Sequence, residues 1–157
     1  IVEDGKPIAG VLQCPVLNEV IEAGKGFGAS QNGLPIQTCL PPPGEKISMA
    51  SAKRMVDVLP EGWRDRVIVH PYVPSLAYRI AMVARGDIAG TFIRPNSHDW
   101  DLAAADLILS ESGGALLNND AQPLHYGGPT LQHGALVASS GNLLQEMLSV
   151  VADWPLS

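Results

Sequence analysis

The chain has 157 residues, of which 46% are hydrophobic and 17% charged, a composition that excludes intrinsic disorder and fits one globular domain. The formal net charge of −6 disfavours nucleic-acid binding, and no apolar stretch is long enough to span a membrane. The only two cysteines, Cys14 and Cys39, indicate no zinc site and fit a reducing compartment, so we expect a cytoplasmic protein; a disulfide between them is the alternative.

The first third of the chain predicts a β-meander. Asp4-Gly5 predicts a tight turn because glycine accepts a positive φ, and Asn32-Gly33 predicts a type I′ hairpin for the same reason. Apolar residues predict strands over 8–17 and 19–23. The glycine-rich segment 24–29 superficially matches a phosphate-binding loop, but no helical pattern follows it, so the glycines fit the meander better.

The rest of the chain alternates predicted strands and helices. Strands are expected over 47–50, 67–70, 88–93, 115–118 and 134–139, and helices over 52–59, 75–85, 99–112 and 142–151. Residues 67–70 have the composition of a buried strand, and Ser75 is a suitable N-cap for the helix that follows. This alternation predicts an α/β fold with helices packed on a sheet.

The densest group of polar side chains lies where a loop enters the helix predicted over 99–112. Asp99 and Asp101 fall in its first turn, where free backbone N–H groups and the helix dipole favour carboxylates. One interpretation is therefore purely structural. The other is that a carboxylate here binds Mg²⁺, which prefers oxygen ligands and often takes only one or two from the protein.

Three stretches of the chain resemble one known family. The segment from Trp100 to Gly114 resembles the C-terminal signature of the inositol monophosphatase family, W-D-x-A-A-G-x-x-I-x-x-E-A-G-G. Residues 26–36 resemble the family's G-x-G-A-x-x-N-G-x-x-I meander, and residues 4–17 are similar to the strand before it. The resemblance implies the C-terminal α/β domain of the sugar-phosphatase fold, with a central mixed sheet flanked by helices.

The same resemblance implies that part of the family's machinery lies outside this chain. The family's N-terminal half carries a metal-binding Glu and the motif D-P-[IL]-D-G-T, whereas the only Asp-Gly here is Asp4-Gly5. The start of the chain lacks Met and does not read as a signal peptide. We therefore expect residues 1–157 to form a single C-terminal domain with no catalytic residue of its own, inactive without the N-terminal metal-binding half of its own chain.

The resemblance assigns roles to several residues around the helix starts. Asp101 matches a metal ligand that also contacts substrate, and Ser75 and Leu76 match positions that line the substrate pocket. Pro74 departs from the family's usual Gly, so the resemblance does not fix the local backbone path there. The implied cofactor is Mg²⁺, and the implied partners are a small phosphorylated substrate and a second copy of the chain in a homodimer, with no nucleic-acid polymer and no membrane.

Two arginines bear on the choice of substrate. Arg94 stands where the inositol-phosphate branch carries a Glu that binds sugar hydroxyls, and Arg79 lies near a basic position of the 3′(2′),5′-bisphosphate nucleotidases. Their guanidinium groups suit a second phosphate, although Arg79 could instead point to solvent. His98 and Trp100 are expected to support the loop before Asp101.

The expected function is a Mg²⁺-dependent phosphomonoesterase that hydrolyses inositol monophosphate or a similar small phosphate ester. The first alternative is a 3′(2′),5′-bisphosphate nucleotidase of the same family. The second is an inactive interaction or dimerisation module that keeps the fold. The histidines of the later loop, His125 and His133, are expected at the surface, outside any site.

Overall fold

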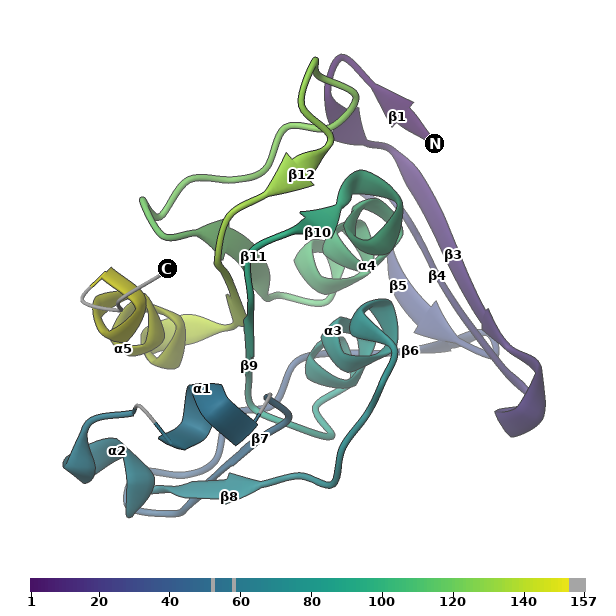
Figure 1. The fold of residues 1–157 in the computed structure, drawn as a ribbon. Helices are drawn as coiled ribbons and strands as arrows, with labels where there is room; N and C mark the ends of the chain where they lie inside the picture. The colour runs from purple at the N-terminus through teal and green to yellow at the C-terminus, as the bar shows by residue number, and fades with distance from the viewer. Residues whose placement is uncertain (52, 58, 153–157) are drawn as a thin grey trace.

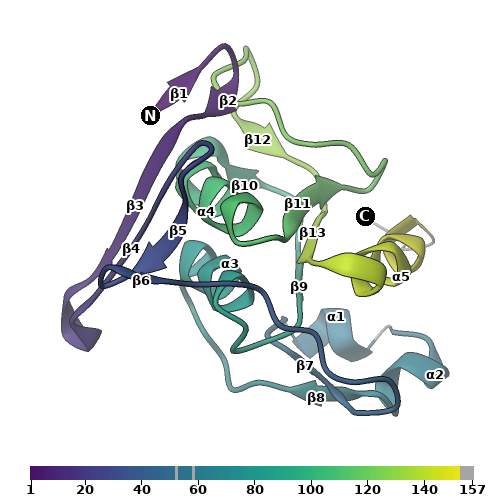
Figure 2. The same cartoon turned by 180° about the vertical axis from the view of Figure 1, so that it is seen from behind.

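The computed structural model describes residues 1–51, 53–57 and 59–152, and their elements stack in four layers (Figures 1 and 2). An antiparallel meander forms the outer layer, two helices lie behind it, a mixed sheet follows, and further helices cover the far face. The predicted α/β fold with a mixed sheet flanked by helices is confirmed. None of the helices in the described part of the chain is long and apolar enough to cross a membrane.

The N-terminal strands form hairpins, as their turn residues predict. They are β1 (Val2–Glu3), β2 (Lys6–Pro7), β3 (Ala9–Cys14), β4 (Glu19–Gly24), β5 (Gly28–Gln31) and β6 (Leu34–Pro35), and the last four form one antiparallel sheet. Asn32 and Gly33 have φ values of 50° and 78°, which confirms the type I′ turn. The strand expected over 8–17 ends at Cys14 because Pro15 opens a 3₁₀ turn, η1 (Pro15–Leu17).

The glycine-rich turn between β4 and β5 binds a carboxylate of the chain itself. Gly26 and Gly28 both have positive φ, and their N–H groups donate to Glu111 Oε1 and Oε2 at 2.8 and 2.9 Å. Glu111 lies far along the chain, at the end of helix α4 (Asp99–Glu111). The turn therefore anchors the meander to this helix, and its resemblance to a phosphate-binding loop is superficial.

The mixed sheet runs through the middle of the molecule. Its strands are β7 (Ile47–Met49), β8 (Val67–Val69), β9 (Thr91–Ile93), β11 (Ala115–Asn118) and β13 (Leu136–Ser139). β7 pairs with β8 in parallel, a parallel bridge from Met49 to Gly90 joins β7 to the start of β9, and β9, β13 and β11 pair antiparallel. The prediction that residues 67–70 form a buried strand is wrong, since β8 is an edge strand whose Ile68 is 52% exposed.

Helices pack on both faces of the mixed sheet. α3 (Leu76–Ala84) and α4 lie between it and the meander, while α1 (Lys53–Asp57), α2 (Glu61–Arg64) and α5 (Gly141–Ala152) lie on the far side (Figure 2). The helix expected over 52–59 is described only as α1, because Ala52 and Val58 lie outside the described residues. Ser75 caps α3 as predicted, since its Oγ accepts a hydrogen bond from Tyr78 N at 3.3 Å.

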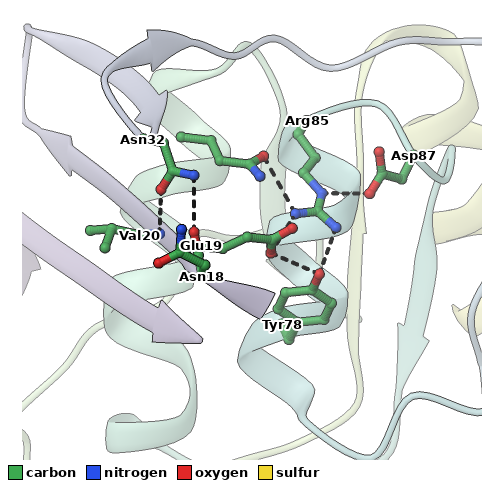
Figure 3. A network of polar contacts seen from close by, with 8 residues as sticks. Asn18, Glu19, Val20, Asn32, Tyr78, Arg85 and Asp87 are labelled. Carbon is green, nitrogen blue, oxygen red and sulfur yellow. Dashed lines mark hydrogen bonds and ion pairs between the residues drawn. The ribbon is translucent and has the colours of Figure 1, made fainter. Parts of the chain in front are cut away.

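The meander and the inner helices meet closely. A Cβ on Gly10 would lie only 2.9 Å from Ala104 Cα, so β3 can approach α4 only because both positions are small. The end of α3 is joined to β4 through Arg85, whose guanidinium donates to Glu19 at 2.9 Å and to the Tyr78 hydroxyl at 2.7 Å (Figure 3). Arg85 also pairs with Asp87. The four side chains fix α3 between the two sheets.

Candidate functional site

The candidate site lies at the start of α4, where a short strand turns into the helix. This strand, β10 (Ser97–His98), pairs antiparallel with β12 (Gln132–His133), and Figure 1 shows β10 leading into α4. Asp101 lies in the first helical turn with its side chain 44% exposed. Its only hydrogen bond within the described chain comes from His98 N–H to Oδ2 at 3.3 Å, so the carboxylate is largely available to a ligand.

The two residues predicted to support this turn lie beside the carboxylate. His98 Nδ1 is 3.9 Å from Asp101 Oδ2, and the imidazole stacks on the Trp100 ring with centroids 4.3 Å apart. Trp100 is 70% exposed. The stacked pair forms an exposed aromatic surface next to Asp101, outside the cavity described next.

A cavity of about 290 Å³ connects Asp101 to the start of α3. Its walls are formed by Met55, Tyr72, Pro74, Leu76, Arg79, Phe92, Ile93, Arg94, Pro95, Asn96, Ser97 and Asp101. Of the predicted site residues, the structure thus brings Leu76, Arg79, Arg94 and Asp101 to one cavity. Ser75 lies next to it as the cap of α3, and His98 and Trp100 lie outside its walls.

Two polar atoms in these walls are buried without a partner. Arg79 Nε and Ser97 Oγ make no hydrogen bond within the described residues, although a buried polar atom normally has one. The alternative that Arg79 points to solvent is therefore wrong. Burial is the main cause that lowers the pKa of the Arg79 guanidinium; the nearby Tyr72 acts in the opposite direction, and the charge of Arg94 lowers the pKa further. An anion bound by Arg79 and Arg94 would stabilise the charged guanidinium groups against both the burial of Arg79 and their mutual repulsion.

The donors at the site suit one position of a magnesium site. A half-exposed carboxylate is a hard oxygen donor, and Mg²⁺ often binds a protein through one or two carboxylates, with water and phosphate as its other ligands. The described residues hold no group of three or more His, Cys, Asp or Glu side chains arranged for a metal, and Cys14 and Cys39 are both free thiols. Asp101 therefore fits as a single ligand.

Next to Asp101 lies a second polar cluster that the sequence did not reveal. His133 Nε2 is 2.6 Å from Asp99 Oδ1, and the Tyr126 hydroxyl donates to Asp106 Oδ2 at 2.7 Å. The expectation that His133 is a surface residue is wrong, since its side chain is only 10% exposed, whereas His125 is exposed as predicted. These partners lie 34 and 20 residues apart, so no local spacing signals them.

The buried Asp106 carboxyl should make stability depend on pH. Burial raises its pKa to about 6 from 3.8, although the Tyr126 hydrogen bond and the His133 charge lower it in part. Between about pH 4 and 6 the folded state therefore binds more protons than the unfolded chain, so the free energy of unfolding falls as pH rises. Asp106→Asn, which stays neutral, should gain about 1–3 kcal/mol relative to wild type between pH 4.5 and 7.5.

Urea unfolding of both proteins at each pH measures this difference. A difference between Asp106→Asn and wild type that stays constant with pH would contradict a raised pKa for this carboxyl.

Comparison with known proteins gives one family match and several relatives. A family model described as "Inositol monophosphatase family" matches residues 1–153. A histidinol-phosphatase from Mycobacterium tuberculosis is 28% identical over an alignment of 165 positions. The alignment covers 95% of this chain and 58% of the relative. A 3′(2′),5′-bisphosphate nucleotidase, CysQ, from Aggregatibacter actinomycetemcomitans is 26% identical over 133 residues, with 80% and 49% covered.

A solved structure of an IMPase from Thermotoga maritima superimposes with a TM-score of 0.81 at 24% identity, covering 97% of this chain and 58% of that one. This likeness shows that the two proteins share a fold. The chain spans somewhat more than half the length of the first of these relatives and of this solved structure.

Proposed function

Because the chain belongs to the inositol monophosphatase family, we propose that it is the C-terminal part of a Mg²⁺-dependent phosphomonoesterase that acts on a small phosphate ester. The observation that carries this proposal is the meeting of Asp101, Arg79 and Arg94 at one cavity. A half-exposed carboxylate that lines the same cavity as two arginines offers one oxygen ligand for a cation, next to groups that can bind phosphate. Inositol monophosphate, after which the family is named, is the first substrate to test.

In this proposal Asp101 would hold the ion, Arg79 would bind the anionic substrate, and Arg94 would contact a second phosphate where the substrate carries one. When bound, Mg²⁺ supplies a water of lowered pKa and neutralises charge on the phosphoryl oxygens. Ser75 and Leu76 would form the wall of the pocket at the start of α3, and the stack of His98 on Trp100 would support the turn that carries Asp101. No residue of the chain is assigned as the catalytic acid, base or nucleophile.

The remaining parts of the site would come from outside residues 1–157. Asp101 alone cannot complete the coordination of a cation, and the chain covers 58% of its relative from Mycobacterium tuberculosis. We therefore propose that an N-terminal half of the same polypeptide supplies the other ligands and the residues that activate water. We also propose a cytoplasmic location and a homodimer, as the resemblance implies.

A second candidate function is hydrolysis of a substrate with two phosphates, such as a 3′(2′),5′-bisphosphate nucleotide. The buried, unpaired Arg79 Nε and the nearby Arg94 favour it, because a second phosphate would give both guanidinium groups a partner. The relative CysQ has this activity in its name. A third candidate, an inactive interaction module, would keep the fold without turnover.

A direct assay separates these candidates. The natural polypeptide that contains this chain should release phosphate from inositol 1-phosphate or from 3′-phosphoadenosine 5′-phosphate only when Mg²⁺ is present. The 157-residue chain alone should be inactive, because one carboxylate cannot assemble the metal site. If the natural polypeptide, shown to be folded by circular dichroism, hydrolyses neither ester, the inactive module is the correct interpretation.

A further inference from the structure

The two acids in the first turn of α4 have opposite surroundings. Asp99 is fully engaged: Oδ1 binds His133 Nε2 at 2.6 Å, Oδ2 accepts the Gly127 N–H at 2.7 Å, and its own N–H donates to Leu131 O at 3.0 Å. The side chains of Asp99 and His133 are only 14% and 10% exposed. Asp101, by contrast, has one long hydrogen bond from the His98 N–H. Asp99 is thus held by three hydrogen bonds, whereas the Asp101 carboxylate accepts one long hydrogen bond.

His133 is itself held firmly enough to act as an anchor. It lies in β12 opposite Ser97 of β10, and its carbonyl accepts the Asn96 N–H at 2.9 Å. The ring of Tyr126 packs against the imidazole with centroids 5.6 Å apart. Tyr126 in turn donates to Asp106, seven residues after Asp99 and so on nearly the same face of α4. The imidazole is thus held between Asp99 of α4 and the ring of Tyr126, which is itself bonded to Asp106 of the same helix.

The hydrogen bond to Asp101 itself is too weak to fix the direction of its carboxylate. The His98 N–H contacts only Oδ2, at 3.3 Å, so this one long hydrogen bond orients the carboxylate weakly. A firmer hold on the first turn has to come from another residue. Asp99 meets this need, because its three partners all lie in the loop and strand that cover α4, and none of them involves Asp101.

We propose that Asp99 and His133 are positioning residues, which fix the first turn of α4 so that the Asp101 carboxylate keeps the direction needed to bind a divalent cation. This inference rests on the proposed function, in which Asp101 is a metal ligand. The anchoring groups touch neither the cation nor the substrate. Loss of residues that orient a metal ligand typically costs 10- to 100-fold in metal affinity.

The experiment measures Mn²⁺ affinity by electron paramagnetic resonance on the natural polypeptide, together with the Mg²⁺ dependence of turnover. His133→Ala should weaken Mn²⁺ binding about 10- to 100-fold and raise the Mg²⁺ concentration for half-maximal activity, with KM for the ester changed less than about threefold. His133→Gln, whose amide can donate from nearly the same place as Nε2, should restore most of the affinity. The matched control is His125→Ala, an exposed histidine of the same loop, which should bind Mn²⁺ like wild type.

A structural role alone would lower the melting temperature without changing metal affinity in the folded protein. If His133→Ala does not fold, Asp99→Asn keeps a carbonyl oxygen for one of the two donors and should weaken Mn²⁺ binding about 3- to 10-fold. Wild-type affinity in either folded variant, while Asp101→Asn loses metal, overturns this inference and leaves the proposed function standing. Wild-type affinity in Asp101→Asn overturns the proposed function.

Discussion

Asp101→Asn in the natural polypeptide is expected to lower kcat/KM for the phosphate ester at least 100-fold while changing the free energy of unfolding by less than about 1 kcal/mol. Loss of a metal ligand removes several kcal/mol of transition-state stabilisation, and each 1.4 kcal/mol is a factor of ten in rate. The folded state, in contrast, loses little. Asparagine can still accept the His98 N–H, and the helix-dipole contribution of an exposed first-turn acid is only about 0.3–1 kcal/mol.

Steady-state kinetics at saturating Mg²⁺ and urea unfolding of the same preparations test this expectation. Asp120→Asn, which removes one negative charge from an exposed loop position, is the control and should match wild type in both measurements. A variant at position 101 that unfolds several kcal/mol more easily yet keeps full activity per folded molecule would show that Asp101 only stabilises the helix start.

Arg94→Glu is expected to lower kcat/KM for 3′-phosphoadenosine 5′-phosphate by about 10- to 100-fold and to leave inositol 1-phosphate nearly unaffected. Arg94 and Arg79 line the same cavity as Asp101, and a hydrogen bond to a charged group contributes roughly 1.5–3 kcal/mol. A second phosphate would use this contact, whereas an inositol ring with a single phosphate at the metal would not. The ratio of the two kcat/KM values is therefore the quantity to follow.

Lys46→Glu makes the same charge change at an exposed position just before β7, outside the walls of the cavity, and should leave the ratio unchanged. Equal losses on both substrates in Arg94→Glu would mean that Arg94 supports the loop between β9 and β10. No loss on either substrate would mean that its side chain stays in solvent, and the second-phosphate hypothesis would lose its main support.

The sequence predicted those features of the fold whose physical cause lies in a few neighbouring residues. The turn at Asn32-Gly33 follows from two positive φ values in adjacent residues, and the start of α3 follows from Ser75 capping an N–H three residues away. The strand 67–70 was predicted as buried because its residues are apolar. Its exposure depends on which strand ends the sheet, and that order is decided by chain crossovers, which apolar patterning does not encode.

The contacts of the candidate site, too, could be predicted from the sequence only in part. That Asp101 and Arg94 share a pocket was implied by the resemblance to the family, and both line one cavity in the structure. The contact between Asp99 and His133 spans 34 residues and depends on the pairing of two-residue strands, too short to leave a pattern. Arg79 lay between two interpretations, helix exterior or pocket, until the packing of α3 showed that its Nε is buried.

Helix α4 carries the candidate ligand Asp101 in its first turn, packs along its length against the meander, and is bonded to the β4–β5 turn through its last residue. With 13 residues it is a rod of about 20 Å, with Asp101 near its first residue and Glu111 as its last. A shift of the β4–β5 turn would therefore act on the same stiff helix that carries Asp101 near its other end. The Phe27 side chain at that turn is 93% exposed, whereas Gly26 and Gly28 on either side of it are held by the Glu111 carboxylate, at the end of the helix opposite Asp101.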